Sequence, residues 1–203
     1  ARLQALLARF EALRVAVLGD FFLDQYFEID PACVETSVET GRPAHQVTAV
    51  RHAPGAAGTV VNNLVALGVQ SIAVLGVTGD DGNGWSLRRD LTALGCDLAH
   101  LLTDDACVTP TYLKTQDRTL PGLEGERDRF DIKNRTPLPG RVSEALLASV
   151  DRLLPALDAL IMMDQVPEEG CGVLSPPMID ALSERAKRNP QTLFWADSRR
   201  RIR

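Results

Sequence analysis

The sequence is poor in the residues that build metal centres, disulfide frameworks and membrane spans. It has four cysteines and three histidines among 203 residues, with no C-x-x-C pair and no two histidines at metal-ligand spacing. No apolar run approaches the roughly 20 residues that a membrane-spanning helix requires. We therefore expect reduced thiols, no metal site built by this chain, no membrane partner and a cytoplasmic location.

Positive charge is also scarce. Acidic residues outnumber lysine and arginine by 27 to 22, giving a net charge of -5. A surface that tracks phosphates needs a basic excess, so this balance argues against nucleic acid as a partner. The one basic cluster, the arginine-rich end over 197–203, is interpreted as a solvated tail. No hydrolase or P-loop motif occurs, and no G-x-G-x-x-G follows the first predicted strand.

Strand-like and helix-like segments alternate along most of the chain. Short apolar runs predict buried strands at 15–19, 71–76, 158–164 and 192–197. A further short strand is predicted at 97–102. Apolar residues at helical spacing predict helices at 1–14, 55–68, 84–95, 141–154 and 175–188. Strands that alternate with helices through short links predict an α/β fold: a doubly wound, mostly parallel sheet with helices on both faces.

A second set of strands is more exposed. Alternating residues predict strands at 25–29, 45–51, 111–116 and 127–132. We interpret them as a small β-sheet lid drawn from about 25–51 and 111–132. The last buried strand is followed by few residues, and a parallel sheet rarely ends on an uncovered edge. We therefore expect residues 1–203 to be the N-terminal portion of a domain that is truncated before its C-terminal half.

Carboxylates follow each of the predicted buried strands. They lie in the segments 19–24, 76–81, 164 and 197–200. Ligands of open α/β sheets bind beyond the carboxyl ends of the strands, and carboxylate oxygens are good acceptors for hydroxyl groups. A single acid at such a place can equally be a turn former or a helix cap. Several at one edge of the sheet predict a hollow that binds a polyol.

The helix predicted at 55–68 begins with glycine and alanine. Small residues let a ligand approach the backbone, and the free N–H groups of a first helical turn favour a polar or anionic group. Tight packing of the helix on the sheet explains these residues equally well.

Taken in order, these segments resemble the ribokinase-like (PfkB) family of carbohydrate kinases, most closely the branch that phosphorylates heptose phosphates for ADP-heptose synthesis. The resemblance rests on VLGDFFLDQY, APGAAGTVVNNLVALG, VLGVTGDDGNGWSLRRDLTALGCD, TPTYLK, DRFDI and FWADSRRRI. It implies ATP-dependent, Mg²⁺-assisted phosphorylation of a hydroxyl on a sugar or sugar phosphate. It also implies a homodimer formed through the lids.

The resemblance assigns roles to particular residues. Asp24 would accept hydrogen bonds from sugar hydroxyls, and the phenylalanines before it would pack a turn. Lys114 and Arg129 would contact a sugar phosphate from the lid, although a solvated strand face explains both as well. The substrate-binding residues implied are Asp20, Asp24, Gly55, Ala56, Thr59, Asn63, Lys114 and Arg129.

Two departures from the family pattern bear on activity. The family usually has two glycines and an asparagine where this chain has Gly55, Ala56 and Thr59, which predicts a different substrate from that of the nearest relatives. The N-x-x-E and G-A-G-D segments, which would supply the magnesium shell, the anion hole and the general base, do not occur in the sequence. The catalytic residues are therefore unassigned, and the base is expected beyond Arg203.

Two other functions remain open. A catalytically inactive sugar-binding or regulatory protein of the same fold would also lack these segments. A Rossmann-type oxidoreductase domain would need a phosphate-binding glycine fingerprint near Gly19, which the sequence does not have.

Overall fold

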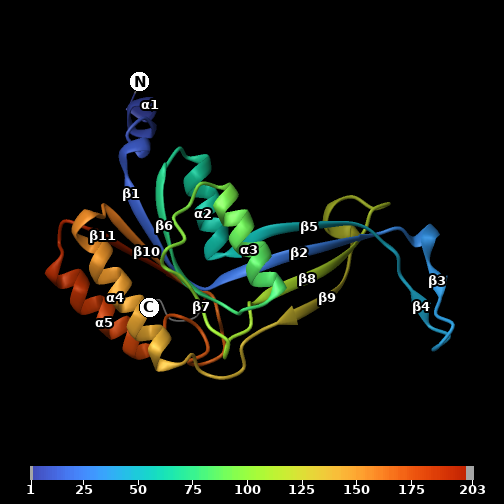
Figure 1. Ribbon diagram of the computed structural model, residues 1–203. Coiled ribbons are helices and arrows are strands. Elements are labelled where there is room, and N and C mark those ends of the chain that lie inside the picture. The colour runs from blue at the N-terminus through green and yellow to red at the C-terminus, as the bar shows by residue number, and fades with distance from the viewer. Residues whose placement is uncertain (1, 200–203) are drawn as a thin grey trace.

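The protein has a layered α/β body with a second sheet projecting from one side (Figure 1). The computed structural model describes residues 2–199. All strands of the five-stranded central sheet run parallel, in the order β11-β10-β1-β6-β7. The strands are β1 (Arg14–Gly19), β6 (Ser71–Thr78), β7 (Leu101–Thr103), β10 (Ala159–Asp164) and β11 (Leu193–Ser198). The predicted parallel sheet is confirmed. Only the end of the segment 97–102 belongs to a strand, β7, while Asp97 makes an isolated bridge to Ala73.

Helices cover both faces of this sheet, as the alternating pattern predicts. The four long helices are α2 (Ala57–Ala66), α3 (Gly82–Ala93), α4 (Gly140–Leu153) and α5 (Pro176–Arg188). Val15 and Val17 of β1 pack in one core cluster with residues of α2 and α3. Ala16 and Leu18 point to the other face and pack with residues of α4 and α5. Burial of each large apolar side chain contributes about 1.5–3 kcal/mol, so both faces of β1 are fixed.

The N-terminal helix is shorter than predicted. Instead of one helix over 1–14, the chain forms α1 (Arg2–Leu7) and a 3₁₀ turn, η1 (Phe10–Ala12). None of their residues is buried, and Leu3 is 69% exposed. The amphipathic pattern is present, but only Phe10 and Leu13, which follow α1, pack against the core. No residue of α1 is buried, so packing does not extend the helix. No helix in the described part of the chain is both long and apolar enough to span a membrane.

The more exposed strands form a second sheet, which we call the outer sheet. It comprises β2 (Phe21–Ile29), β5 (Val47–Ala56), β8 (Thr111–Asp117) and β9 (Glu126–Ile132), in the order β5-β2-β8-β9. The segment between β2 and β5 extends away from the body (Figure 1). It contains the 3₁₀ turn η2 (Pro31–Cys33) and the short hairpin of β3 (Glu35–Thr36) and β4 (Pro43–Ala44).

The chain passes directly from the central sheet into the outer sheet. Only Asp20 separates β1 from β2, so the turn expected between them does not exist. Phe21 and Phe22 lie within β2 and are almost fully buried. Phe21 packs in the core, while the ring of Phe22 meets the edge of the Tyr112 ring at 5.1 Å. A Cβ at Gly19 would overlap the carbonyl oxygen of Met163, so the strand crossing requires glycine there.

Candidate functional site

A polar cavity of about 460 Å³ lies between the outer sheet and the carboxyl ends of β10 and β11; we call it the intersheet cavity. The outer sheet, the start of α2 and the ends of the two central strands all contribute side chains to it. Its lining residues are Phe22, Asp24, Ala56, Thr59, Val60, Tyr112, Lys114, Arg129, Met163, Gln165, Asp197 and Arg199. The site therefore joins segments that are far apart in the sequence, at the edge where α/β sheets bind ligands.

Asp24 is the acid of the outer-sheet wall. Its side chain is 22% exposed, and the nearest cation is the Nζ atom of Lys114, 3.8 Å from Oδ1. Within residues 2–199 the carboxylate accepts no hydrogen bond from the protein. Burial raises the pKa of Asp24, and the charges of Lys114 and Arg129 partly oppose this rise. A half-buried carboxylate with unused acceptor sites is suited to take hydrogen bonds from a ligand.

The segment after β5 closes around this carboxylate. A Cβ at Gly55 would lie 2.5 Å from Oδ2 of Asp24, so the carboxylate packs against the backbone of this glycine. Gly55 itself does not line the cavity. Ala56 has φ 53 and ψ −117, a backbone conformation that L residues rarely adopt. Thr59, in the first turn of α2, is exposed and lines the cavity. Asp24 and Thr59 thus face one hollow.

Two cations from the outer sheet line the same wall. Lys114 lies over the ring of Tyr26, with Nζ 5.1 Å from the ring centroid. Arg129 lies over the ring of Tyr112 at 4.8 Å and pairs with Asp131 at 2.8 Å. The hydrogen bond from Arg129 to Asp131 raises the pKa of the guanidinium. Aromatic faces hold both cations in place beside Asp24.

Asp20, which is also predicted to lie near the sugar, does not line the intersheet cavity. It is 5% exposed, and its carboxylate accepts hydrogen bonds from the main-chain N–H groups of Val173 at 2.8 Å, Gln165 at 2.9 Å and Val166 at 3.2 Å. Burial raises the pKa of Asp20 to about 6, although these hydrogen bonds act in the opposite direction. Asp20 therefore fixes the loop that follows β10.

The remaining predicted residues divide as follows. Ala56, Thr59, Lys114 and Arg129 line the cavity together with Asp24. Asn63 is exposed on α2, one turn beyond Thr59, and is not part of the lining. Position along the helix decides this, because only the first turn of α2 reaches the cavity.

Sequence reasoning missed most of the central-sheet wall. Gln165 follows β10, and Arg199 follows β11. Arg199 falls in the arginine-rich end interpreted as a solvated tail, and also in the strand-end segment 197–200, for which the prediction concerns only the carboxylate. Arg200 to Arg203 lie outside the described residues. The rule that ligands bind beyond strand ends would have found both residues, had it been applied to every polar side chain and not only to acids.

The predicted convergence of strand-end acids is only partial. Asp197 lines the intersheet cavity, as Asp24 does. Asp81 instead caps α3, accepting hydrogen bonds from the main-chain N–H groups of Gly84 at 2.7 Å and Thr109 at 2.8 Å. Asp164 accepts a hydrogen bond from the hydroxyl of Ser198 at 2.6 Å. The structural interpretation, a cap or a turn, therefore applies to some of these acids.

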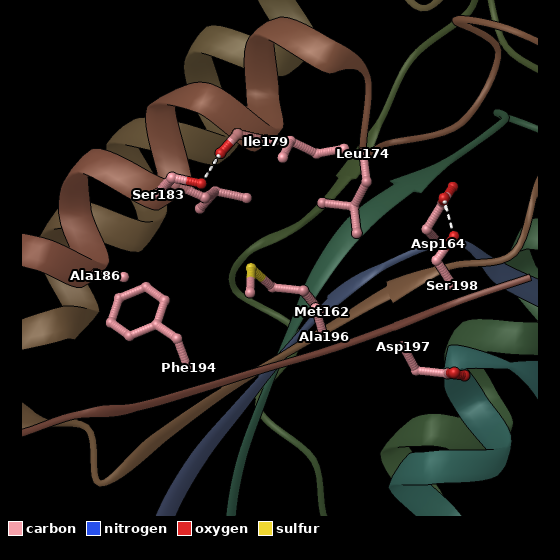
Figure 2. Close-up of a pocket in the computed structure, with 11 residues that line it drawn as sticks. Met162, Asp164, Leu174, Ile179, Ser183, Ala186, Phe194, Ala196, Asp197 and Ser198 are labelled. Carbon is pink, nitrogen blue, oxygen red and sulfur yellow. Dashed lines mark hydrogen bonds between the residues drawn. The ribbon is translucent and has the colours of Figure 1, made fainter. Parts of the chain in front are cut away.

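A second hollow, of about 190 Å³, lies between α5 and the strands β10 and β11 (Figure 2). Figure 2 shows the side chains of Met162 and Phe194 in it, with the bonded pair Asp164 and Ser198 at one end. On the other face of β11, Trp195 is 61% exposed. This hollow is mainly apolar, so the intersheet cavity, with its opposed charges, is the site suited to a polar substrate.

No group of three or more metal-ligating side chains in residues 2–199 is arranged to hold a metal ion. Magnesium in phosphoryl-transfer sites is usually held by one or two carboxylates together with substrate phosphates. We therefore assign no magnesium ligand to the described part of the chain.

Known proteins share both sequence and fold with this chain. The chain is 31% identical over 193 residues to the bifunctional protein HldE of Paramagnetospirillum magneticum, covering 91% of this chain and 36% of that protein. The ribokinase of Cryptococcus neoformans in complex with ADP superimposes with a TM-score of 0.55 at 16% identity, covering 94% of this chain and 51% of that one. This chain has the ribokinase-like fold and is similar in sequence to HldE proteins. No family model matches its sequence.

Further HldE proteins match this ribokinase-like chain in the same way. A candidate ribokinase II from E. coli, in complex with ATP and Mg²⁺, has a TM-score of 0.57 at 17% identity, covering 94% of this chain and 54% of that one. The chain spans about a third of the length of the curated relatives it matches and about half of the solved ribokinase-like chains. The predicted ribokinase-like fold and the predicted resemblance to sugar kinases of the heptose branch are confirmed.

Proposed function

We propose that this chain supplies the acceptor-binding part of an ATP-dependent kinase that phosphorylates a hydroxyl group of a heptose phosphate. The observation that carries the proposal is the environment of Asp24. Its half-buried carboxylate has no hydrogen-bond donor among residues 2–199 and lies in a polar cavity beside Lys114 and Arg129. Hydroxyl groups match the free acceptor sites of the acid, and a phosphate matches the two cations.

In this proposal, different side chains of the cavity bind the hydroxyl groups and the phosphate of the acceptor. Asp24 accepts hydrogen bonds from hydroxyl groups and so fixes the orientation of the sugar ring. Lys114 and Arg129 neutralise the phosphate that the acceptor carries, and Thr59 lines the same cavity from the first turn of α2. In phosphoryl transfer, positioning and charge neutralisation provide most of the catalysis, and little covalent chemistry is left to the protein.

The outer sheet acts as a lid in this proposal. It projects from one side of the central sheet (Figure 1), and the intersheet cavity lies where the two sheets meet. Closure over the acceptor excludes water, which favours transfer to the sugar over hydrolysis of the nucleotide.

ATP and Mg²⁺ supply the phosphoryl group and neutralise its charge in this proposal. Their support is the complex of the ribokinase-like neighbour with ATP and Mg²⁺ and the resemblance of the motifs. The sequence contains neither N-x-x-E nor G-A-G-D, so we assign no base and no nucleotide-binding residue. We expect the 203-residue chain by itself to bind acceptor without transferring phosphate.

Calorimetric titration of the 203-residue chain with a heptose phosphate tests the proposal. Hydrogen bonds to a charged group contribute about 1.5–3 kcal/mol each, so Asp24→Ala should lower the affinity at least about 100-fold while leaving the thermal unfolding transition in place. Asp128→Ala, an exposed acid on β9 outside this cavity, is the matched control and should bind as the unchanged protein does. Equal affinity of the Asp24→Ala variant would remove Asp24 from the site.

We also propose a homodimer in the cytoplasm, formed through the face of the outer sheet that points away from the cavity. Because side chains alternate along a strand, Phe130 and Val50 lie on the face opposite to Asp24 and Arg129. Phe130 is 58% exposed and Val50 is 50% exposed. A second copy of the chain would bury these apolar side chains.

A further inference from the structure

The wall of the intersheet cavity that belongs to the central sheet carries a cation that has no carboxylate partner among residues 2–199. Arg199 follows β11 and lines the cavity, and it forms no ion pair within the part of the chain that the structure describes. The outer-sheet cations differ, since Lys114 lies 3.8 Å from Asp24 and Arg129 lies 2.8 Å from Asp131. The positive charge of Arg199 is therefore available to an anionic ligand.

The buried side-chain amide of Gln165 orients the guanidinium of Arg199. Gln165 is 6% exposed; its Oε1 atom accepts a hydrogen bond from Nε of Arg199 at 2.8 Å, and its Nε2 atom donates to Oδ2 of Asp197 at 3.2 Å. An amide accepts on one side and donates on the other, so Gln165 can bond to both groups and hold them apart. Direct pairing of Arg199 with Asp197 would neutralise the cation. The terminal nitrogens of the guanidinium remain for a ligand.

The main chain of Gln165 is fixed by a hydrogen bond to the buried carboxylate of Asp20. Its main-chain N–H donates to Oδ2 of Asp20 at 2.9 Å, and the next N–H, of Val166, donates to the same oxygen at 3.2 Å. The main-chain N–H of Arg199 donates to the carbonyl oxygen of Asp164 at 3.2 Å. Both residues are thus anchored through the backbone at the ends of neighbouring strands, and a site on such rigid elements holds its geometry.

We propose that Arg199 binds a phosphate group at the central-sheet wall of the cavity and that Gln165 is the residue that positions it. This inference rests on the proposed function, in which Lys114 and Arg129 hold the phosphate that the acceptor already carries. Arg199 then holds the second phosphate, on the hydroxyl that becomes phosphorylated. The ligand class is a sugar bisphosphate with its two phosphates at opposite walls, and the planar guanidinium suits phosphate oxygens.

The experiment compares the affinities of a heptose monophosphate and the corresponding heptose bisphosphate for the 203-residue chain by calorimetric titration. The unchanged chain should bind the bisphosphate at least about tenfold more tightly, as one charge-assisted contact provides. Arg199→Met should remove this preference, lowering the affinity for the bisphosphate about tenfold relative to that for the monophosphate. Arg188→Met, which removes an exposed arginine of α5, is the charge-matched control and should keep the preference.

Variants at Gln165 separate positioning from a merely structural role. In Gln165→Glu the new carboxylate should pair with Arg199, so the preference for the bisphosphate should fall although the arginine is still present. Gln165→Leu should also lower the preference, because the guanidinium is no longer aimed. General damage to the fold would instead weaken both ligands by the same factor.

Three outcomes would overturn the inference. Equal binding of both ligands by the unchanged chain excludes a second phosphate site, even if monophosphate binding upholds the proposed function. Parallel loss of both affinities in Arg199→Met places the arginine at the first phosphate instead. Failure of both ligands to bind refutes the proposed function and this inference together.

Discussion

The carboxylate of Asp24 occupies the space that a side chain at residue 55 would need. The two residues lie on adjacent antiparallel strands, two positions out of register, and a Cβ built on Gly55 would be 2.5 Å from Oδ2 of Asp24. The glycine is thus part of the site without lining it. Its contribution is the absence of a side chain, which lets the acid lie against the backbone of β5.

This relationship predicts the effect of Gly55→Ala. The methyl group cannot coexist with the observed position of the carboxylate, so Asp24 must rotate away, and affinity for a heptose phosphate should fall at least about tenfold. Gly82→Ala is the control, because a Cβ at Gly82 would meet no atom within 4 Å. Titration of both variants checks the prediction, and unchanged affinity of Gly55→Ala would show that the carboxylate position is not needed for binding.

The strained backbone at Ala56 predicts a stabilising substitution. At φ 53 and ψ −117 an L residue costs about 1–3 kcal/mol, whereas glycine adopts this region freely. The additional freedom of glycine in the unfolded chain offsets about 0.4–1 kcal/mol of this gain. Ala56→Gly should therefore raise the free energy of unfolding by about 1 kcal/mol in urea denaturation. Ala53→Gly, on the same strand without positive φ, should lower it; a loss of stability in both variants would contradict the strain.

The buried Asp20 predicts a dependence of stability on pH. Its pKa is raised to about 6, against 3.8 for an ordinary aspartate. Between these two pH values the folded chain holds a proton on Asp20 that the unfolded chain releases. The contribution of this proton to the free energy of unfolding is therefore complete below about pH 4 and is lost as pH rises through about 6. The loss is about 3 kcal/mol for this shift.

Unfolding free energies of the unchanged chain and of Asp20→Asn, measured from pH 4 to pH 8, check this prediction. The variant cannot titrate at this position, so the difference between the two proteins should change between pH 4 and about 6 and stay constant above pH 7. A constant difference over the whole range would mean that Asp20 titrates normally in the folded chain.

The exposed apolar face of the outer sheet predicts the effect of a charge on self-association. In analytical ultracentrifugation the unchanged chain should sediment as a dimer, and Phe130→Glu should shift it to a monomer, because a carboxylate is costly to bury in an apolar interface. Trp195→Glu changes another exposed aromatic side chain, on β11, and should leave the dimer intact. Dissociation by Trp195→Glu alone would place the interface at β11.

The order of the helices and strands is readable from local pattern. Short β-branched runs such as Val15 to Leu18 can be covered on both faces only in a parallel sheet, and they alternate with segments of helical spacing. The N-terminal helix is the exception, because an amphipathic stripe predicts a long helix only when another element covers it. The candidate site is partly readable too, since Asp24, Lys114 and Arg129 lie in segments with a recognisable resemblance.

What the sequence determined by itself is the α/β pattern, the parallel sheet and the presence of an acid beside two cations on exposed strands. Only the tertiary structure decided which acids serve the cavity. Asp20 and Asp24 are close in sequence, yet Asp20 lies where β1 leaves the central sheet, and its carboxylate accepts hydrogen bonds from three main-chain N–H groups. Asp24 instead faces the cavity, and its carboxylate accepts no hydrogen bond from residues 2–199. Gln165 and Arg199 likewise meet only because their strands are neighbours in the sheet. Local periodicity specifies which face of an element is apolar, but it carries no information on which strand ends lie side by side.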